Sequence, residues 1–150
     1  MRRGVIVAGL LICLAWGGMA QAHAGGKDVR YTGKSGQGRR VVLLTDQRGE
    51  LKRFAIHFKA VCGRGILEDG IQRFIRPLRH VDEDGFRDAG DYDYSYSKGR
   101  KAEIRTRLEG ERVEAGRFEG TFTFKGKYFT AGGAKITTCR TAEVHWSASR

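Results

Sequence analysis

The segment Phe54-Ala55-Ile56-His57-Phe58-Lys59-Ala60 decides the fold class of this chain. Its large apolar side chains recur at every second position, and Ala55, His57 and Lys59 fall between them. A period of two places alternate side chains on opposite faces of an extended strand, with one face buried and the other wetter. The segment therefore predicts a half-buried β-strand rather than a helix.

The same alternation recurs twice toward the C-terminal end of the chain. Residues 117–124 carry apolar or glycine positions on one side and Arg117, Glu119, Thr121 and Thr123 on the other. In residues 141–148 the apolar side consists of Ala142, Val144, Trp146 and Ala148. These segments predict two more strands, each with one face toward a core.

Glycine-rich turn signals separate the apolar segments at short intervals, and no segment has convincing helical periodicity. The pattern predicts an all-β fold, an antiparallel β-sandwich or barrel of about eight short strands with one disulfide. The expected strands cover roughly residues 28–32, 39–45, 51–61, 71–78, 92–97, 102–108, 113–124 and 140–148. Pro77 is expected at a strand end or sheet edge because it cannot donate a ladder hydrogen bond. A short helical turn within 66–74 is the one exception that we expect.

The N-terminus is typical of a secretory signal peptide. Arg2 and Arg3 precede an apolar run, 4–16, which is shorter than the about 20 residues that span a membrane. Cleavage is expected after Ala22 or Ala24, at one of two overlapping Ala-x-Ala sites. The predicted organisation is a cleaved signal, 1–24, and a single β domain, 25–150, located in the medium, the periplasm or the cell envelope.

Two cysteines remain after removal of this signal, which carries Cys13 away. Export places Cys62 and Cys139 where disulfides persist, and an even pair most simply forms one bridge. A free thiol pair and a metal site are the alternatives, but neither cysteine has a second ligand at metal-binding spacing. Cys139 falls on the polar side of the last strand, so a bulge or bend near Arg140 must turn it toward the core.

Four motifs stand out along the chain: Tyr31-Thr32-Gly33-Lys34-Ser35-Gly36-Gln37-Gly38, Cys62-Gly63-Arg64-Gly65, the Gly-Arg-Phe-x-Gly step of 116–120, and Cys139 followed by Val144-His145-Trp146-Ser147-Ala148. Together they resemble those of uncharacterised secreted β-sandwich proteins of bacteria. The resemblance covers nearly all of the predicted mature chain. It implies export, a disulfide and a sandwich, and it supplies no activity, ligand or catalytic residue.

An acidic stretch, 82–93, interrupts an otherwise basic chain. Its carboxylates make Asp82, Asp84, Asp88 and Asp91 calcium candidates, because hard cations prefer several oxygen ligands from one loop. The commoner alternative is a solvated loop whose acids pair with arginines and lysines. Since the spacing lacks the pattern of a helix-loop-helix calcium site, we expect no metal and no cofactor.

Tyr92, Tyr94 and Tyr96 share one side of a predicted strand, with carboxylates and serines on the other. An exposed tyrosine row could stack on sugar rings, which would make it a sugar-binding face. Packing in the core or on the sheet surface is the plainer alternative, because tyrosine buries a large area and needs one partner for its hydroxyl.

The chain is strongly basic, with a formal net charge of +11. Loss of the signal removes Arg2 and Arg3 and no acid, which leaves +9. Such a charge attracts polyanions at long range, although it also serves solubility and protects sheet edges. Specific nucleic-acid binding is not expected, because no base-reading or stacking motif appears.

No catalytic motif stands out in the sequence. The histidines at 57, 80 and 145 form no metal-binding pair, and neither a nucleophile elbow nor a phosphate loop occurs. We therefore expect a non-catalytic binding or structural module that contacts an anionic envelope polymer or a carbohydrate. A small-substrate hydrolase on a sandwich scaffold is the alternative, which would need a pocket with converging polar groups.

Overall fold

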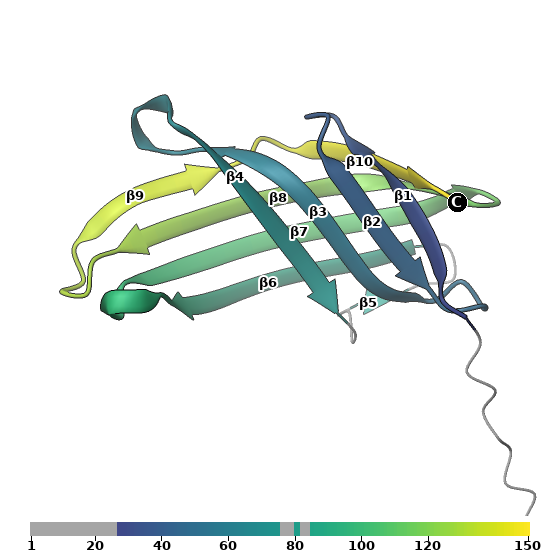
Figure 1. Cartoon of the computed structure of the whole chain (residues 1–150), viewed down its shortest axis with the longest axis horizontal. Coiled ribbons are helices and arrows are strands. Elements are labelled where there is room, and N and C mark those ends of the chain that lie inside the picture. The colour runs from purple at the N-terminus through teal and green to yellow at the C-terminus, as the bar shows by residue number, and fades with distance from the viewer. Residues whose placement is uncertain (1–26, 76–79, 82–84) are drawn as a thin grey trace, which may run out of the picture.

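The computed structural model describes residues 27–75, 80–81 and 85–150. This part of the chain forms a 10-stranded antiparallel sheet with two short 3₁₀ turns (Figure 1). The all-β prediction is therefore confirmed. No helix in these residues is long and apolar enough to cross a membrane.

Four strands form what we call the first layer. They are β1 (Val29–Ser35), β2 (Arg40–Thr45), β3 (Leu51–Val61) and β4 (Leu67–Ile75), each antiparallel to the next. The strand predicted from 54–60 lies in β3, where Phe54, Ile56, Phe58 and Ala60 are buried. The alternation therefore sets which face of this layer turns inward.

The next five strands form the second layer. They are β5 (His80–Val81), β6 (Gly85–Ser95), β7 (Lys101–Glu114), β8 (Arg117–Phe129) and β9 (Lys135–Arg140). The turn η1 (Gly63–Gly65) joins β3 to β4, and η2 (Ser97–Gly99) joins β6 to β7. Figure 1 shows the long strands of this layer running obliquely to those of the first.

The last strand, β10 (Val144–Ser149), joins the two layers because it pairs with both β1 and β8. At the other end of the same side, Val61 of β3 pairs with Arg140 of β9. The sheet thus folds back on itself and is continuous along one side. The opposite side ends at β4 and at β6, which carries only the short β5 on its outer edge.

Aromatic side chains fill the space between the layers. Phe54 of the first layer lies 4.8 Å from Trp146, and Phe58 lies 5.1 Å from Phe122 of the second, measured between ring centroids. Such pairs contribute about 0.5–1.5 kcal/mol each beyond their buried area. This core holds the layers at a fixed spacing.

A disulfide joins Cys62 to Cys139, as predicted. The predicted bend is present as well, because the chain leaves the ladder between β9 and β10. There Thr141 donates its N–H to the carbonyl of Phe124 at 3.0 Å, and its hydroxyl accepts the N–H of Phe124 at 3.0 Å. This break allows Cys139 to be buried although it lies on the polar side of the last strand.

Three expectations about local structure are wrong. The predicted strand 113–124 is interrupted, because Ala115 and Gly116 form the turn between β7 and β8. Residues 66–74 contain no helical turn, because the backbone from Leu67 pairs with β3 along the whole of β4. The predicted last strand, 140–148, is two strands separated by the bend. The predicted signal, 1–24, together with Pro77, Asp82 and Asp84, lies outside the described residues.

Candidate functional site

A groove of about 970 Å³ opens between the two layers, beside both 3₁₀ turns. In Figure 1, β4 crosses over β7 and β6 and leaves their η2 ends to one side. Part of the inner face of the second layer is therefore not covered by the first. The groove has walls from both layers, and we treat it as the candidate binding site.

A row of tyrosines lies on the inner side of the second layer, and we call it the tyrosine wall. It consists of Tyr92 and Tyr94 in β6, Tyr96 between β6 and η2, and Tyr128 in β8. Tyr96 and Tyr128 line the groove. Tyr94 packs on Tyr96 with ring centroids 5.1 Å apart and remains 56% exposed, so it continues the wall beyond the groove. An exposed row of aromatic rings is the kind of surface on which a flat ligand stacks.

The innermost tyrosine of the wall is held neutral. Burial raises the pKa of Tyr128 to about 12, and the neighbouring Tyr96 adds to the shift. A free tyrosine is already neutral at pH 7, so the shift extends this neutrality into the alkaline range, and a hydrogen bond joins Tyr128 to Tyr96. Tyr92 is fixed differently, since its hydroxyl hydrogen-bonds to that of Thr106.

The floor of the groove is apolar. Phe58 of β3 and Phe124 of β8 meet there with ring centroids 4.8 Å apart, beside Ala60 and the Cys62–Cys139 disulfide. The disulfide joins the end of β3 to β9, so it crosslinks the first layer to the second at this end of the groove. A floor of this kind favours a ligand with an apolar face.

Charged side chains stand around the groove. The cations are Arg64, Arg100, Lys101 and Lys135, and the acids are Glu68 and Asp69. Asp69 accepts a hydrogen bond from Arg39 at 2.6 Å, which neutralises it. The rim therefore carries an excess of positive charge and favours anionic groups on a ligand.

The two 3₁₀ turns place strained cationic residues next to the groove. Arg64 in η1 and Lys98 in η2 both have φ 63°, and no other non-glycine residue in the described ranges has a positive φ. Each turn is closed by a backbone hydrogen bond of 2.8 Å, from Cys62 to Ile66 and from Tyr96 to Arg100. A left-handed conformation costs about 1–2 kcal/mol per residue, and such strain clusters at functional sites.

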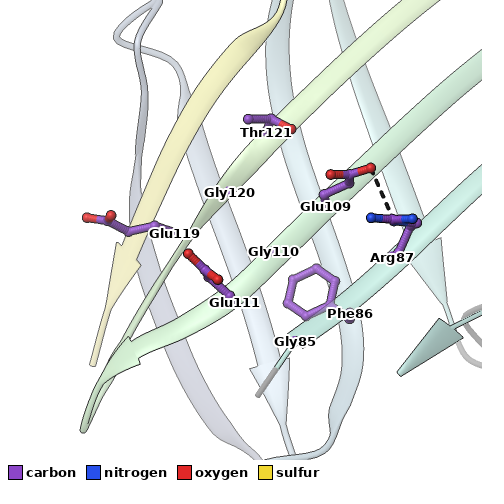
Figure 2. A pocket seen from close by; sticks show the side chains of 9 residues that line it. All are labelled: Gly85, Phe86, Arg87, Glu109, Gly110, Glu111, Glu119, Gly120 and Thr121. Carbon is purple, nitrogen blue, oxygen red and sulfur yellow. Dashed lines mark ion pairs between the residues drawn. The ribbon is translucent and has the colours of Figure 1, made fainter. Parts of the chain in front are cut away.

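A second pocket, of about 570 Å³, lies on the outer face of the second layer (Figure 2). Glu109, Glu111 and Glu119 surround a floor that includes Gly110 and Gly120. Two of these acids are already neutralised: Arg87 pairs with Glu109 at 3.1 Å, and Arg117 pairs with Glu119. No group of three metal-ligating side chains occurs among the described residues. This pocket therefore offers less specific chemistry than the groove.

The acidic stretch is not a loop in the part that the structure describes. Asp88 and Asp91 lie in β6 on opposite sides of the strand, Asp88 on the side of the tyrosine wall and Asp91 on the outer side. Asp91 accepts hydrogen bonds from Arg105 at 2.8 and 3.0 Å. The structure thus separates these two calcium candidates, while Asp82 and Asp84 lie outside the described residues.

The two histidines whose side chains are described lie away from the groove. His57 of β3 is opposite Ile71 on the outer side of the first layer. His145 is exposed, with its Nε2 3.7 Å from an oxygen of Glu143. The hydrolase alternative gains no specific support from these positions.

Comparison of the chain with protein-family models and with curated proteins finds no match. The resemblance to secreted bacterial β-sandwich proteins therefore stays a prediction. Sequence reasoning named Tyr92, Tyr94 and Tyr96 but missed Tyr128, and it did not assign Arg64 or the other rim cations to a site. The sequence signal for Tyr128 is its even position, which places it on the same side of β8 as Phe122 and Phe124. β7 pairs with both β8 and β6, so this side continues into the tyrosines of β6.

Proposed function

We propose that this protein is an exported, non-catalytic binding module that holds an acidic, sugar-rich polymer in the groove. The observation that carries the proposal is the tyrosine wall, left exposed beside rim cations. The predicted signal peptide supports export, because its positive start, short apolar run and Ala-x-Ala sites belong to secretory signals.

The chemistry of the groove fits such a polymer. A sugar ring presents an apolar face of C–H groups, which packs on the flat rings of Tyr94 and Tyr96. Acid groups along the polymer would pair with Arg64 and Arg100, because a guanidinium binds a carboxylate through two parallel hydrogen bonds. The phenol oxygens of the Tyr96–Tyr128 pair would accept a hydrogen bond from a sugar hydroxyl.

The test is retention of the purified mature protein on immobilised polygalacturonate and on neutral dextran over a series of salt concentrations. We expect retention on the acidic polymer that persists above moderate salt. Tyr94→Ala should abolish this salt-resistant part, because it removes the most exposed ring of the wall. Val113→Ala, an exposed apolar position in β7 that does not line the groove, is the control and should leave retention unchanged.

The rim cations are tested by a second pair of variants. Arg64→Asn removes a charge but keeps a residue that tolerates positive φ, so the turn should survive. Arg48→Asn removes the same charge from the turn between β2 and β3, outside the groove. We expect weaker retention for Arg64→Asn alone.

Three results would overturn the proposal. Complete release by moderate salt, with no effect of Tyr94→Ala, would reduce the interaction to bulk charge. Equal weakening by the two arginine variants would lead to the same conclusion. No retention on either polymer would refute binding of this ligand class.

A further inference from the structure

The outward face of the first layer is positively charged. Six of its side chains form what we call the basic face: Arg30 and Lys34 of β1, Arg40 of β2, Arg53 and Lys59 of β3, and Arg73 of β4. They share this face because they alternate along the strands with buried residues such as Tyr31, Val41 and Phe54.

The strand register brings these cations onto one continuous surface. Lys34 lies opposite Arg40, and Arg30 lies opposite Leu44, which in turn lies opposite Arg53. Neighbouring strands are about 4.8 Å apart, so the whole face spans four strands within roughly 15 Å. A surface of this width presents all six charges to one partner at the same time.

None of the six cations pairs with a carboxylate of the described residues. The register does place one acid on this face, Asp69 opposite Lys59. However, Asp69 is already paired with Arg39. The positive charge of the face is therefore not neutralised from within the described part of the chain.

The outward face of the second layer is different. Acids and bases alternate across its strands and form ion pairs, such as Arg105 with Asp91 at 2.8 Å and Lys127 with Glu103 at 2.8 Å. Because the two faces differ in this way, the net charge of the protein is concentrated on the first layer. That asymmetry orients the molecule in the field of an anionic partner.

Exposed aliphatic side chains accompany the charges at one end of the basic face. Val61 and Leu67 lie opposite each other and are 48% and 60% exposed, and Ile71 of the same face is 46% exposed. A soluble polyanion offers such residues nothing apolar. A lipid bilayer does, since its interface accepts apolar side chains beneath a layer of anionic headgroups.

We propose that the basic face docks the protein on a bilayer containing anionic lipids. Its arginines and lysines contact headgroup phosphates, and Val61, Leu67 and Ile71 insert at the interface. The attraction decays within a Debye length, about 10 Å at 0.1 M salt, so docking is salt-dependent. The groove uses other residues, which makes this proposal independent of the proposed function.

Co-sedimentation with vesicles tests the docking. The mature protein is mixed at low salt with vesicles of phosphatidylglycerol and phosphatidylcholine, or of phosphatidylcholine alone. We expect binding to the anionic vesicles only. Replacing Arg30, Arg53 and Arg73 by Gln should weaken that binding by at least about tenfold, because each basic residue near an anionic bilayer contributes separately.

The control variant carries the same loss of charge on the other layer. It replaces Arg107, Lys125 and Lys127 by Gln, three outward cations of the second layer, and should bind vesicles nearly as well as the wild type. A further variant, Leu67→Ser with Ile71→Ser, should release the vesicles at a lower salt concentration. Circular dichroism of each variant checks that the fold is kept.

Several outcomes would contradict the docking proposal. Equal weakening by the two triple variants would mean that net charge alone drives the binding. Binding to soluble polygalacturonate through the basic face, without vesicle binding, would identify a polymer as its partner. Absence of any vesicle binding would refute it outright, and a loss caused by Tyr94→Ala would assign the lipid contact to the groove instead.

Discussion

Tyr96 and Tyr128 lie with their ring centroids 6.2 Å apart, although they come from chain segments on either side of β7. Their contact extends the tyrosine wall from the edge of the second layer to the floor of the groove. It also places one phenol where burial suppresses its ionisation. The contact between these two rings therefore connects the shape of the groove to the pKa of Tyr128, which a titration can measure.

The first prediction concerns that ionisation. A free tyrosine ionises at pH about 10, whereas folding raises the pKa of Tyr128 to about 12. The unfolded chain releases this proton first, so raising the pH from about 10 to 12 draws the protein toward unfolding. The contribution is intact below pH about 10 and is lost as the pH rises through the folded pKa.

Urea unfolding between pH 8 and about 12 measures this effect. We expect the free energy of unfolding of the Tyr128→Phe variant to fall less steeply above pH about 10 than that of the wild type. Lysines also titrate in this range, but they affect both proteins alike. Parallel curves for the two proteins would show that Tyr128 is not shifted.

The second prediction concerns the disulfide. Cys62 and Cys139 are 77 positions apart, and closing a loop of that length stabilises the fold by about 4 kcal/mol on the chain-entropy model. The double Cys→Ser variant should lose an amount of this order. Reduced wild-type protein should match it in denaturant titrations, and a mass two hydrogens lighter than the reduced form identifies the oxidised chain. No loss of stability on reduction would contradict the assigned role.

The third prediction tests how closely β1 approaches β10. A Cβ on Gly33 would lie 1.9 Å from the carbonyl oxygen of Ser147. Because this oxygen belongs to the backbone of β10, one of the two strands would have to move to relieve the clash. Gly33→Ala should therefore lower the free energy of unfolding by about 1–3 kcal/mol. Gly36→Ala is the matched control: its Cβ would meet only the carbonyl oxygen of His145, at 3.7 Å, and the change should stay within about 0.5 kcal/mol.

The fourth prediction concerns export. Expressed from its first residue in a bacterium with a secretory pathway, the protein should be recovered outside the cytoplasm with an N-terminus after Ala22 or Ala24. N-terminal sequencing or intact mass decides this. Recovery of the full-length chain in the cytoplasm would refute the export proposal. There would then be no basis for the expectation that the protein meets its ligand in the cell envelope.

The strands that alternate strictly were predictable from the sequence. β3 matches its predicted bounds, because Phe54, Ile56 and Phe58 repeat with the period of a half-buried strand. The expected strand 71–78 covers only the second half of β4. The first half was missed because Gly70 lies opposite Phe58 and contributes no side chain, so the inner side there shows no apolar alternation. The start of β6 was missed because its acids resemble a solvated loop.

The candidate site was predictable only in part. The shared side of Tyr92, Tyr94 and Tyr96 follows from alternation within one strand. Their exposure does not, because it depends on the angle at which the first layer crosses the second. The basic face escaped notice for a similar reason: its cations are scattered over four strands and gather only through the pairing register.

Binding in the groove is the central claim, and a heteronuclear NMR titration tests it most directly. Isotope-labelled mature protein is titrated with oligomers of galacturonic acid at moderate salt. We predict saturable shifts of the backbone amides of Tyr94, Tyr96 and Tyr128, with those of Arg30 and Gly110 unchanged. Shifts confined to the basic face, or no saturable shift at all, would contradict the claim.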